Sequence, residues 1–279
     1  MSAASSKTPL RIAVIGKGRW GSRIVETLQT LSECQVVAVV SHEWQKLVEI
    51  KIDGVVVATP ASTHFAIALP FVKRGGSVFI EKPFTTSLSD AQQLADEATK
   101  SGAMITVGHL HLYNPAYLAM KQGLAGIGAI QKIVAEAGGP GPIRTDVSVL
   151  WDWMPHDIAL ILDLVGTLPI SVQASASNGT ASASLTFGSG ASASISNSWI
   201  LKEKCRRLTV IGEKGQLVFD DFAPKDPASE RPLTVELRAW LESIVDKKPL
   251  PSDMKEGLAV MKVLEAVAQA ASSQKDANE

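Results

Sequence analysis

Ionisable side chains at two places in the sequence have the types and spacing needed for proton transfer. Lys82 lies in a Glu-Lys-Pro turn just after the strand-like run 77–80. A lysine at the carboxyl end of a parallel strand, when it is near a cofactor and partly desolvated, can have its pKa lowered toward the range of acid–base catalysis. Asp152 and His156 are four residues apart, so one helical turn puts them on a common face. A carboxylate in that position can orient the imidazole as a general base.

Each place also has a structural interpretation, and the residues alone leave both open. Lys82 can be a solvated turn lysine. Asp152 can cap the helix that follows, and His156 can be a buried histidine with satisfied hydrogen bonds. Trp151 and Trp153 flank Asp152 and offer flat apolar surfaces for stacking on a sugar ring or a nicotinamide.

A glycine-rich turn near the N-terminus has the spacing of a dinucleotide-binding motif. It follows the apolar run 10–15 and opens a segment with helical spacing, the context that this motif requires. The first glycine permits a tight turn, the second lets the backbone approach a pyrophosphate, and the third lets the helix pack against the strand. The helix N-terminus then attracts the phosphates. The turn consists of Gly16, Lys17, Gly18, Arg19, Trp20 and Gly21.

The residues after the second predicted strand bear on the choice between NAD and NADP. An acidic residue at this place binds the ribose 2′-hydroxyl and repels a 2′-phosphate. Here the strand 36–40 is followed by Ser41 and His42, which tolerate a phosphate better than a carboxylate does. Glu43 argues the other way if it reaches the ribose. The sequence therefore predicts NAD or NADP, with a slight preference for NADP.

The chain is expected to form two domains of different texture. Over residues 1–108, short β-branched strands alternate with helices, which predicts an α/β, doubly wound Rossmann domain. Residues 109–279 carry an apolar helix over 155–165, alternating Ala and Ser over 174–196, and two closing helices. Period-two alternation is typical of antiparallel strands with one buried face. The second domain is therefore predicted to be α+β with a large, mostly antiparallel sheet.

Composition excludes several classes of protein. The 279 residues are 46% hydrophobic and 20% charged, with a net charge of −1, so nothing indicates binding to nucleic acid or to an anionic membrane. No apolar run reaches the length of a membrane helix. The two cysteines are far apart, and no Cys/His spacing indicates a metal site. The polar N-terminus is unlike a signal peptide, so a cytoplasmic location is expected.

Taken together, these motifs resemble those of the glucose–fructose oxidoreductase / inositol dehydrogenase (Gfo/Idh/MocA) family. The matching stretches run in family order and cover about residues 10–270. They are IAVIGKGRWG, DGVVVATPASTH, VFIEKPF, VGHLHLYNPAY with GIGAI, and WDWMPHDIALILDLVG. The resemblance implies an NAD(P)-dependent oxidoreductase that moves a hydride between a nicotinamide and a hydroxyl or ketone of a sugar-like molecule or polyol. It also implies pairing of the second-domain sheet in a homodimer or homotetramer.

The resemblance also implies roles for individual residues. His156 exchanges the hydroxyl proton, Asp152 orients it, and Lys82 contacts both cofactor and substrate. The remaining implied positions flank the nicotinamide half of the cofactor or approach the substrate. The cofactor positions are Thr59, Pro60 and His64, and the substrate positions are Tyr113 and Asn114 together with His156. From the residues themselves, Glu81 in the lysine turn is predicted to contact the cofactor and the flat ring of Trp151 the substrate.

One departure from the family pattern leaves competing hypotheses about the function. Between Val40 and Gly54 there is room for one short helix, where the family usually has a helix, a strand and a second helix beside the adenine. The alternatives are a non-catalytic dinucleotide-binding regulator of the same fold and a reductase of the biliverdin reductase type. The acid–base set of Lys82, Asp152 and His156 argues against both, because neither requires it.

Overall fold

The computed structural model describes residues 8–143, 147–224 and 226–276. Within these residues the chain forms two compact units. The first comprises residues up to 108 together with 233–255, and the second comprises 109–232 and the residues from 256 onward. Among the described residues, no helix combines the length and apolar character needed to cross a bilayer.

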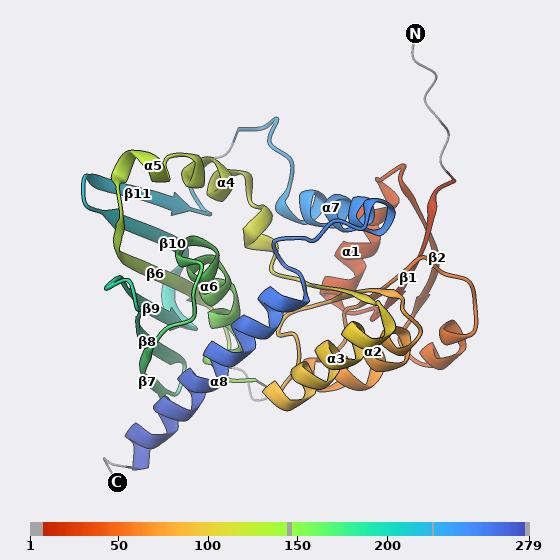
Figure 1. Ribbon diagram of the computed structural model, residues 1–279, viewed down its shortest axis with the longest axis horizontal. Coiled ribbons are helices and arrows are strands. Elements are labelled where there is room, and N and C mark those ends of the chain that lie inside the picture. The colour runs from red at the N-terminus through yellow and green to blue at the C-terminus, as the bar shows by residue number, and fades with distance from the viewer. Residues whose placement is uncertain (1–7, 144–146, 225, 277–279) are drawn as a thin grey trace. The chain divides into compact units, whose positions relative to one another are not determined.

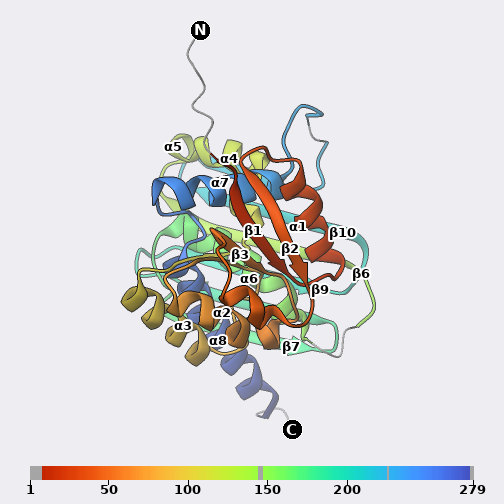
Figure 2. The ribbon, with the colours of Figure 1, turned by 90° about the vertical axis from the view of Figure 1, so that its right-hand side faces the viewer.

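The first unit is built on a five-stranded sheet whose neighbouring strands all run parallel, in the order β2-β1-β3-β4-β5. Helices cover both faces, with α1 and α7 on one and α2 and α3 on the other (Figures 1 and 2). The predicted doubly wound Rossmann domain is therefore confirmed. The strands are β1 (Leu10–Ile15), β2 (Cys34–Val40), β3 (Gly54–Val57), β4 (Ser77–Ile80) and β5 (Met104–Val107). The helices are α1 (Arg19–Gln29), α2 (His64–Lys73), α3 (Leu88–Ser101) and α7 (Pro232–Asp246), with short 3₁₀ turns η1 (Trp44–Val48) and η2 (Ala61–Thr63).

Local sequence signals explain where these elements begin and end. Every residue of β3 and β4 is buried, as expected of a sheet covered on both faces. Helix α3 begins where the Ser87 side chain accepts a hydrogen bond from the Asp90 amide at 3.1 Å. It ends at Gly102, whose φ of +72° favours glycine.

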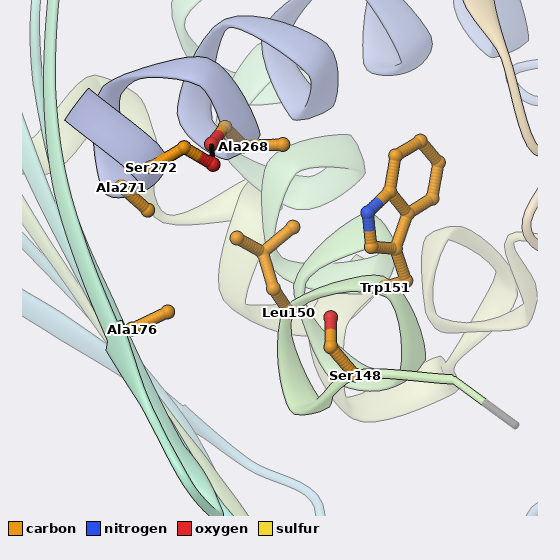
Figure 3. Close-up of a pocket in the computed structure, with 7 residues that line it drawn as sticks. All are labelled: Ser148, Leu150, Trp151, Ala176, Ala268, Ala271 and Ser272. Carbon is orange, nitrogen blue, oxygen red and sulfur yellow. Dashed lines mark hydrogen bonds between the residues drawn. The ribbon is translucent and has the colours of Figure 1, made fainter. Parts of the chain in front are cut away.

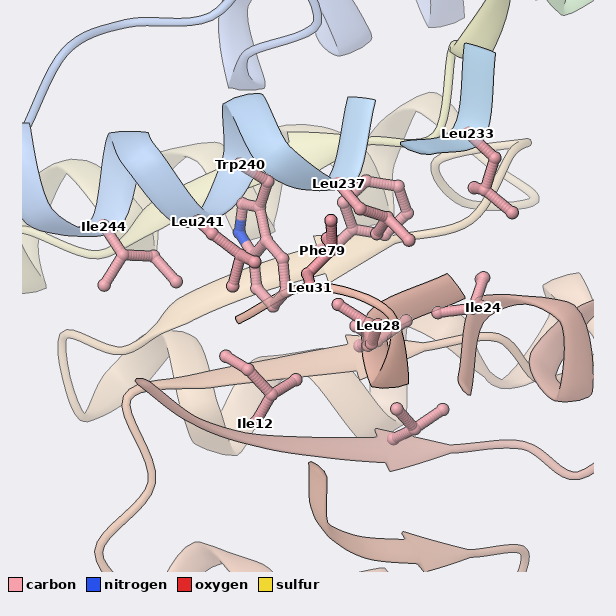
Figure 4. Close-up of a cluster of buried hydrophobic side chains, with 12 residues drawn as sticks. Ile12, Ile24, Leu28, Leu31, Phe79, Leu233, Leu237, Trp240, Leu241 and Ile244 are labelled. Carbon is pink, nitrogen blue, oxygen red and sulfur yellow. The ribbon is translucent and has the colours of Figure 1, made fainter. Parts of the chain in front are cut away.

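Helix α7 packs in the first unit, although it follows most of the second unit in sequence. Trp240 is fully buried, and its ring meets that of Phe79 on β4 edge to face, with centroids 5.6 Å apart. The Trp240 indole N–H donates to Ser77 Oγ at 3.1 Å. Leu237 and Leu241 join the same cluster (Figure 4). Residues 233–255 therefore group with the first unit, because the apolar face of α7 packs against β4 and α1.

The second unit contains a six-stranded mixed sheet in the order β11-β10-β6-β9-β8-β7. All neighbouring strands are antiparallel except β6 and β9, which run parallel. The mostly antiparallel sheet is confirmed. The strands are β6 (Ile130–Pro140), β7 (Ser171–Ser177), β8 (Thr180–Thr186), β9 (Ser192–Ser198), β10 (Ile200–Gly212) and β11 (Gly215–Asp220). The helices are α4 (Pro115–Gln122), α5 (Leu124–Ile127), α6 (Val149–Val165) and α8 (Met254–Asp276), with the 3₁₀ turn η3 (Leu110–Tyr113).

The Ala/Ser alternation divides the two faces of this sheet. On β8, Ala181 and Ala183 are buried while Ser182 and Ser184 are exposed. Helix α6 contacts β6, β8 and β9 and covers the apolar face (Figure 1). The alternation is therefore structural and not a low-complexity linker.

Helix α6 begins six residues earlier than the sequence suggests. We expected a helix over 155–165 with Pro155 in its first turn, but the helix starts at Val149 and holds Pro155 in its interior. Val149 and Leu150 are buried, so their packing offsets the hydrogen bond that the proline removes.

Replacing Trp240 tests whether α7 belongs to the first unit. Trp240→Ala leaves a large cavity against β4 and is expected to lower the free energy of unfolding by about 3–5 kcal/mol. Val245→Ala, on the same helix but 45% exposed, is expected to change it by less than about 0.5 kcal/mol. Urea unfolding measures both. Equal effects of the two substitutions would contradict the packing described for α7.

Candidate active site

The glycine turn between β1 and α1 has the close contacts that its motif requires. Gly16 has φ +119°, and a Cβ on it would lie 2.1 Å from the carbonyl oxygen of Ala58. A Cβ on Gly21 would lie 2.1 Å from the Gly16 oxygen. Gly18, the N-cap of α1, has nothing within 4 Å of the position of a Cβ. Space is therefore open beside a helix N-terminus, and the turn fits a dinucleotide phosphate.

The lysine turn is tied to this glycine turn through a buried carboxylate. Glu81 is 8% exposed, and its Oε1 accepts a hydrogen bond from the indole N–H of Trp20. Its Oε2 accepts the backbone N–H of Lys82 at 3.2 Å. A Cβ at residue 108 would lie 3.0 Å from Glu81 Oε1, so Gly108 leaves the room that this carboxylate occupies. Trp20 and Glu81 thus hold the half-buried Lys82 at a fixed place relative to α1.

His64 joins the loops that follow β3 and β4. Its Nδ1 lies 2.9 Å from the carbonyl oxygen of Pro83, and its Nε2 lies 2.9 Å from that of Thr59. Burial lowers the pKa of His64, which is 1% exposed. Both ring nitrogens therefore face backbone carbonyls, and His64 braces the loop that holds Thr59 and the exposed Pro60. A direct cofactor contact of His64 stays a prediction.

Ser41 and His42 are exposed residues directly after the carboxyl end of β2. Glu43 has φ +56°, and its carboxylate pairs with the ammonium of Lys46 at 3.0 Å. Lys17 and Arg19 are also exposed, at the start of α1. All of the predicted cofactor residues thus follow the carboxyl ends of β1, β2, β3 or β4, the edge at which open α/β sheets bind ligands.

In the second unit, Asp152 and His156 occupy successive turns of α6. His156 is 7% exposed, and the Asp152 carboxylate accepts the indole N–H of Trp199 at 3.2 Å. The shared helix confirms that the two residues lie on one face. The orientation of His156 by Asp152 stays a prediction.

A buried ion pair fixes α6 to the sheet beside His156. Arg206 Nη1 on β10 lies 2.5 Å from Asp157 Oδ1, and the Asn197 amide on β9 donates to Asp157 Oδ2 at 2.7 Å. The Arg206 guanidinium also stacks over Trp153, 5.2 Å from its ring centroid. Burial raises the pKa of Asp157, while Arg206 and Asn197 oppose that rise. These contacts fix the helix rotation that sets the direction of His156.

Two histidines that were not predicted as site residues surround His156. The His111 ring lies edge to face with that of His156, at 4.8 Å between centroids, and the His109 ring does so at 6.3 Å. Both histidines are buried and directly follow β5. Their alternation after a parallel strand was a signal that sequence reasoning did not use. Within the described part of the chain, no group of three or more His, Cys, Asp or Glu is arranged to hold a metal ion.

Two of the predicted substrate residues serve the fold directly. Tyr113 is buried in η3. Asn114 caps α4, because its Oδ1 accepts the Ala116 amide at 3.0 Å and its Nδ2 donates to Asp221 at 2.7 Å. Both ends of the Asn114 amide therefore hold protein groups, which leaves its predicted substrate contact without support from the geometry.

Trp151, also predicted to contact substrate, lines a small cavity of about 230 Å³ between α6, β7 and α8 (Figure 3). Neither Asp152 nor His156 lines this cavity, so it is separate from the acid–base residues. Its lining consists of Ser148, Leu150, Trp151, Ala176, Ala268, Ala271 and Ser272.

The bond between Trp20 and Glu81 can be tested with a matched pair of substitutions. Trp20→Phe keeps a ring but removes the N–H donor to a buried carboxylate. We expect it to lower the free energy of unfolding by about 1–3 kcal/mol. Trp44→Phe, in the half-buried η1 turn, is the control and should cost less. Urea unfolding compares them, and a Trp20→Phe protein as stable as wild type would contradict the assigned bond.

Comparisons with known proteins agree with this geometry. Residues 41–109 match the model of an oxidoreductase family with an NAD-binding Rossmann fold, and residues 126–218 match the Gfo/Idh/MocA C-terminal domain. The crystal structure of a Magnetospirillum magnetotacticum MS-1 protein, described as an oxidoreductase, is 34% identical with a TM-score of 0.86. It covers 93% of this chain and 99% of that chain.

Relatives with named substrates are more distant or are matched over less of their length. UDP-N-acetylglucosamine 3-dehydrogenase from Acidithiobacillus ferrooxidans is 33% identical over 57% of this chain and 53% of that enzyme. Its crystal structure has a TM-score of 0.83 at 26% identity, covering 96% of this chain and 99% of that one. Myo-inositol 2-dehydrogenase from Thermotoga maritima is 24% identical over 76% of this chain and 75% of that enzyme. With both of its halves matched, this chain belongs to the Gfo/Idh/MocA oxidoreductase family.

Proposed function

We propose that this protein is an NAD(P)-dependent oxidoreductase that moves a hydride between the nicotinamide and a hydroxyl or ketone of a sugar-like molecule or polyol. The observation that carries the proposal is the buried His156 on α6, one turn after Asp152 and among two further histidines. It belongs to a chain whose first unit holds the glycine turn and Lys82. The family supports the same class of chemistry.

The proposed mechanism assigns a step to each of these residues. The bound nicotinamide supplies the two-electron redox chemistry. His156 takes the proton of the substrate hydroxyl as the carbon–hydrogen bond breaks, and Asp152 holds the imidazole in the tautomer that accepts it. The Lys82 ammonium stabilises negative charge that develops on the substrate oxygen. The same residues return the proton when a ketone is reduced.

The non-catalytic regulator is the alternative from a different class. The comparisons give it no support, since the relatives with named activities are dehydrogenases. A regulator would bind a dinucleotide without turnover. The substrates of the named relatives, UDP-N-acetylglucosamine and myo-inositol, are therefore the first probes of function.

Loss of either proposed catalytic group should abolish most turnover. Lys82→Ala and His156→Ala are each expected to lower kcat/KM for the better probe by at least about 100-fold, since general acid–base catalysis contributes that much or more. Lys100→Ala, on the exposed end of α3, is the control and should retain wild-type turnover. Reduction of the nicotinamide is followed at 340 nm. Near-normal turnover in both variants would refute the catalytic assignment, and a wild-type protein that oxidises neither these probes nor a wider panel of sugars would refute the function.

For the cofactor, we propose binding of NADP with a slight preference over NAD. Ser41 and His42 place no carboxylate directly after β2, and the carboxylate of Glu43 pairs with Lys46. Ligands that bind only the native state raise its stability by about 2.7 kcal/mol at 100 times Kd. Thermal shifts should therefore be larger with NADP(H) than with NAD(H).

A charge placed after β2 should reverse that order. Ser41→Asp repels a 2′-phosphate and should favour NAD, whereas Ser32→Asp, before the start of β2, should leave the order unchanged. Equal shifts with both cofactors in wild type and Ser41→Asp would contradict the proposed role of Ser41. No shift with either cofactor at millimolar concentration would contradict dinucleotide binding itself.

We also propose that the chain forms a homodimer or homotetramer, as the resemblance implies. The outer face of β8 presents the small side chains of Ser182 and Ser184, which allow close approach of a second sheet. Light scattering at micromolar concentration is expected to give at least twice the mass of the chain, and a monomer would refute the proposal. The expected cytoplasmic location stays a prediction.

A further inference from the structure

A buried histidine–carboxylate pair lies beside His156, and the proposed mechanism does not use it. His109 is 1% exposed, and its Nδ1 lies 2.8 Å and 2.9 Å from the two carboxylate oxygens of Glu256, in the first turn of α8. A carboxylate only accepts hydrogen bonds, so Nδ1 carries a proton. The pair joins residues 147 positions apart in sequence.

The other ring nitrogen of His109, Nε2, is unusual in its surroundings. His109 Nε2 is buried, and among the described residues it has no hydrogen-bond partner. His64 differs in that each of its nitrogens has a polar neighbour, a carbonyl oxygen at 2.9 Å. A histidine with a purely structural role satisfies its buried nitrogens, since an unsatisfied one costs stability. In the neutral ring, with Nδ1 protonated toward the carboxylate, Nε2 of His109 is the basic nitrogen.

The surroundings of His109 suit an exchange of protons with His156. Their rings are neighbours, edge to face at 6.3 Å between centroids, and a bridging water would relay a proton between them. Among the described residues, the ionisable groups on the elements that carry these rings include Glu256 on α8, His111 and Tyr113 on η3, and Asp152 and Asp157 on α6. Asp157 is paired with Arg206 on β10. The Glu256 carboxylate lies directly against the His109 ring, 2.8 Å from Nδ1.

We propose that the His109–Glu256 pair is a positioning pair that receives the proton from His156. The inference rests on the proposed function. In the oxidation direction the proton of the substrate hydroxyl passes to His156 and then to His109 Nε2. The carbon that bears this hydroxyl gives its hydride to the nicotinamide. Glu256 stays ionised and stabilises the resulting imidazolium. In ketone reduction the proton returns along the same groups.

Nuclear magnetic resonance tests this proton coupling without turnover. The chain has five histidines, so a protein labelled with ¹⁵N-histidine gives few imidazole signals, which single substitutions assign. His109→Asn keeps a donor toward Glu256 but removes Nε2. Glu256→Gln keeps an acceptor but removes the charge. Both should lower the titration midpoint of His156 by about 0.5 pH units or more, because an acceptor and a negative charge each favour its protonated form.

Controls separate this coupling from a structural effect. Glu265→Gln, a half-buried position on the same helix, should leave the midpoint of His156 unchanged. Melting temperatures show whether each variant keeps its fold, and Glu256→Gln preserves a hydrogen bond if His109→Asn unfolds. Unchanged midpoints in the folded variants would overturn the inference.

Kinetics with UDP-N-acetylglucosamine or myo-inositol supply the second readout. His109→Asn is expected to lower kcat by about 100-fold while KM changes less than about threefold, and its pH profile should shift by the amount seen in the titration. A normal kcat with unshifted midpoints would refute the inference and leave the proposed function intact. Shifted midpoints in a protein that oxidises no sugar or polyol would instead refute the proposed function.

Discussion

The positions of three loops in the first unit depend on the hydrogen bonds that one buried carboxylate accepts. Glu81 accepts hydrogen bonds from the indole of Trp20 and from the backbone of Lys82, and it occupies the space that Gly108 leaves. An ionised group at 8% exposure is tolerated only when such partners surround it. The glycine turn, the lysine turn and the end of β5 are therefore held together, and Lys82 takes its place relative to α1 as a result.

The second unit also has a buried carboxylate, and there an ion pair compensates its charge. Asp157 follows His156 directly and is held by Arg206 and Asn197 from two strands. Breaking a buried pair of this kind leaves an uncompensated charge, which costs about 3–5 kcal/mol. Helix α6 thus cannot rotate without that cost. In both units a carboxylate next to the proposed catalytic residue fixes the backbone that carries it.

Sequence patterns predicted those parts of the structure that depend on interactions between residues close together in the chain. The glycine turn and the Ala/Ser alternation each act over a few residues, and the structure agrees with them. The start of α6 was missed because burial of Val149 and Leu150 outweighs an interior proline. For α7, no local pattern says which surface its apolar face covers.

The proposed site likewise contains residues that sequence motifs indicate and residues that only the fold brings together. Lys82 and His156 stood out because their motifs are short and resemble those of a known family. The pairing of His109 with Glu256 joins residues 147 positions apart, and nothing near either residue indicates the other. Such contacts follow from tertiary packing alone.

The short connection after β2 bears on what the first unit offers to a dinucleotide. Between Val40 and Gly54 the chain makes only the η1 turn, so β2 is the last strand at that side of the sheet. The one short helix expected there is a 3₁₀ turn. A family member of usual length has further elements beside the adenine, whereas here the exposed Ser41 and His42 end that side of the edge. On the proposed function, we expect the pyrophosphate turn to supply a larger share of the binding free energy. Backbone contacts constrain that turn tightly, since neither Gly16 nor Gly21 has room for a Cβ.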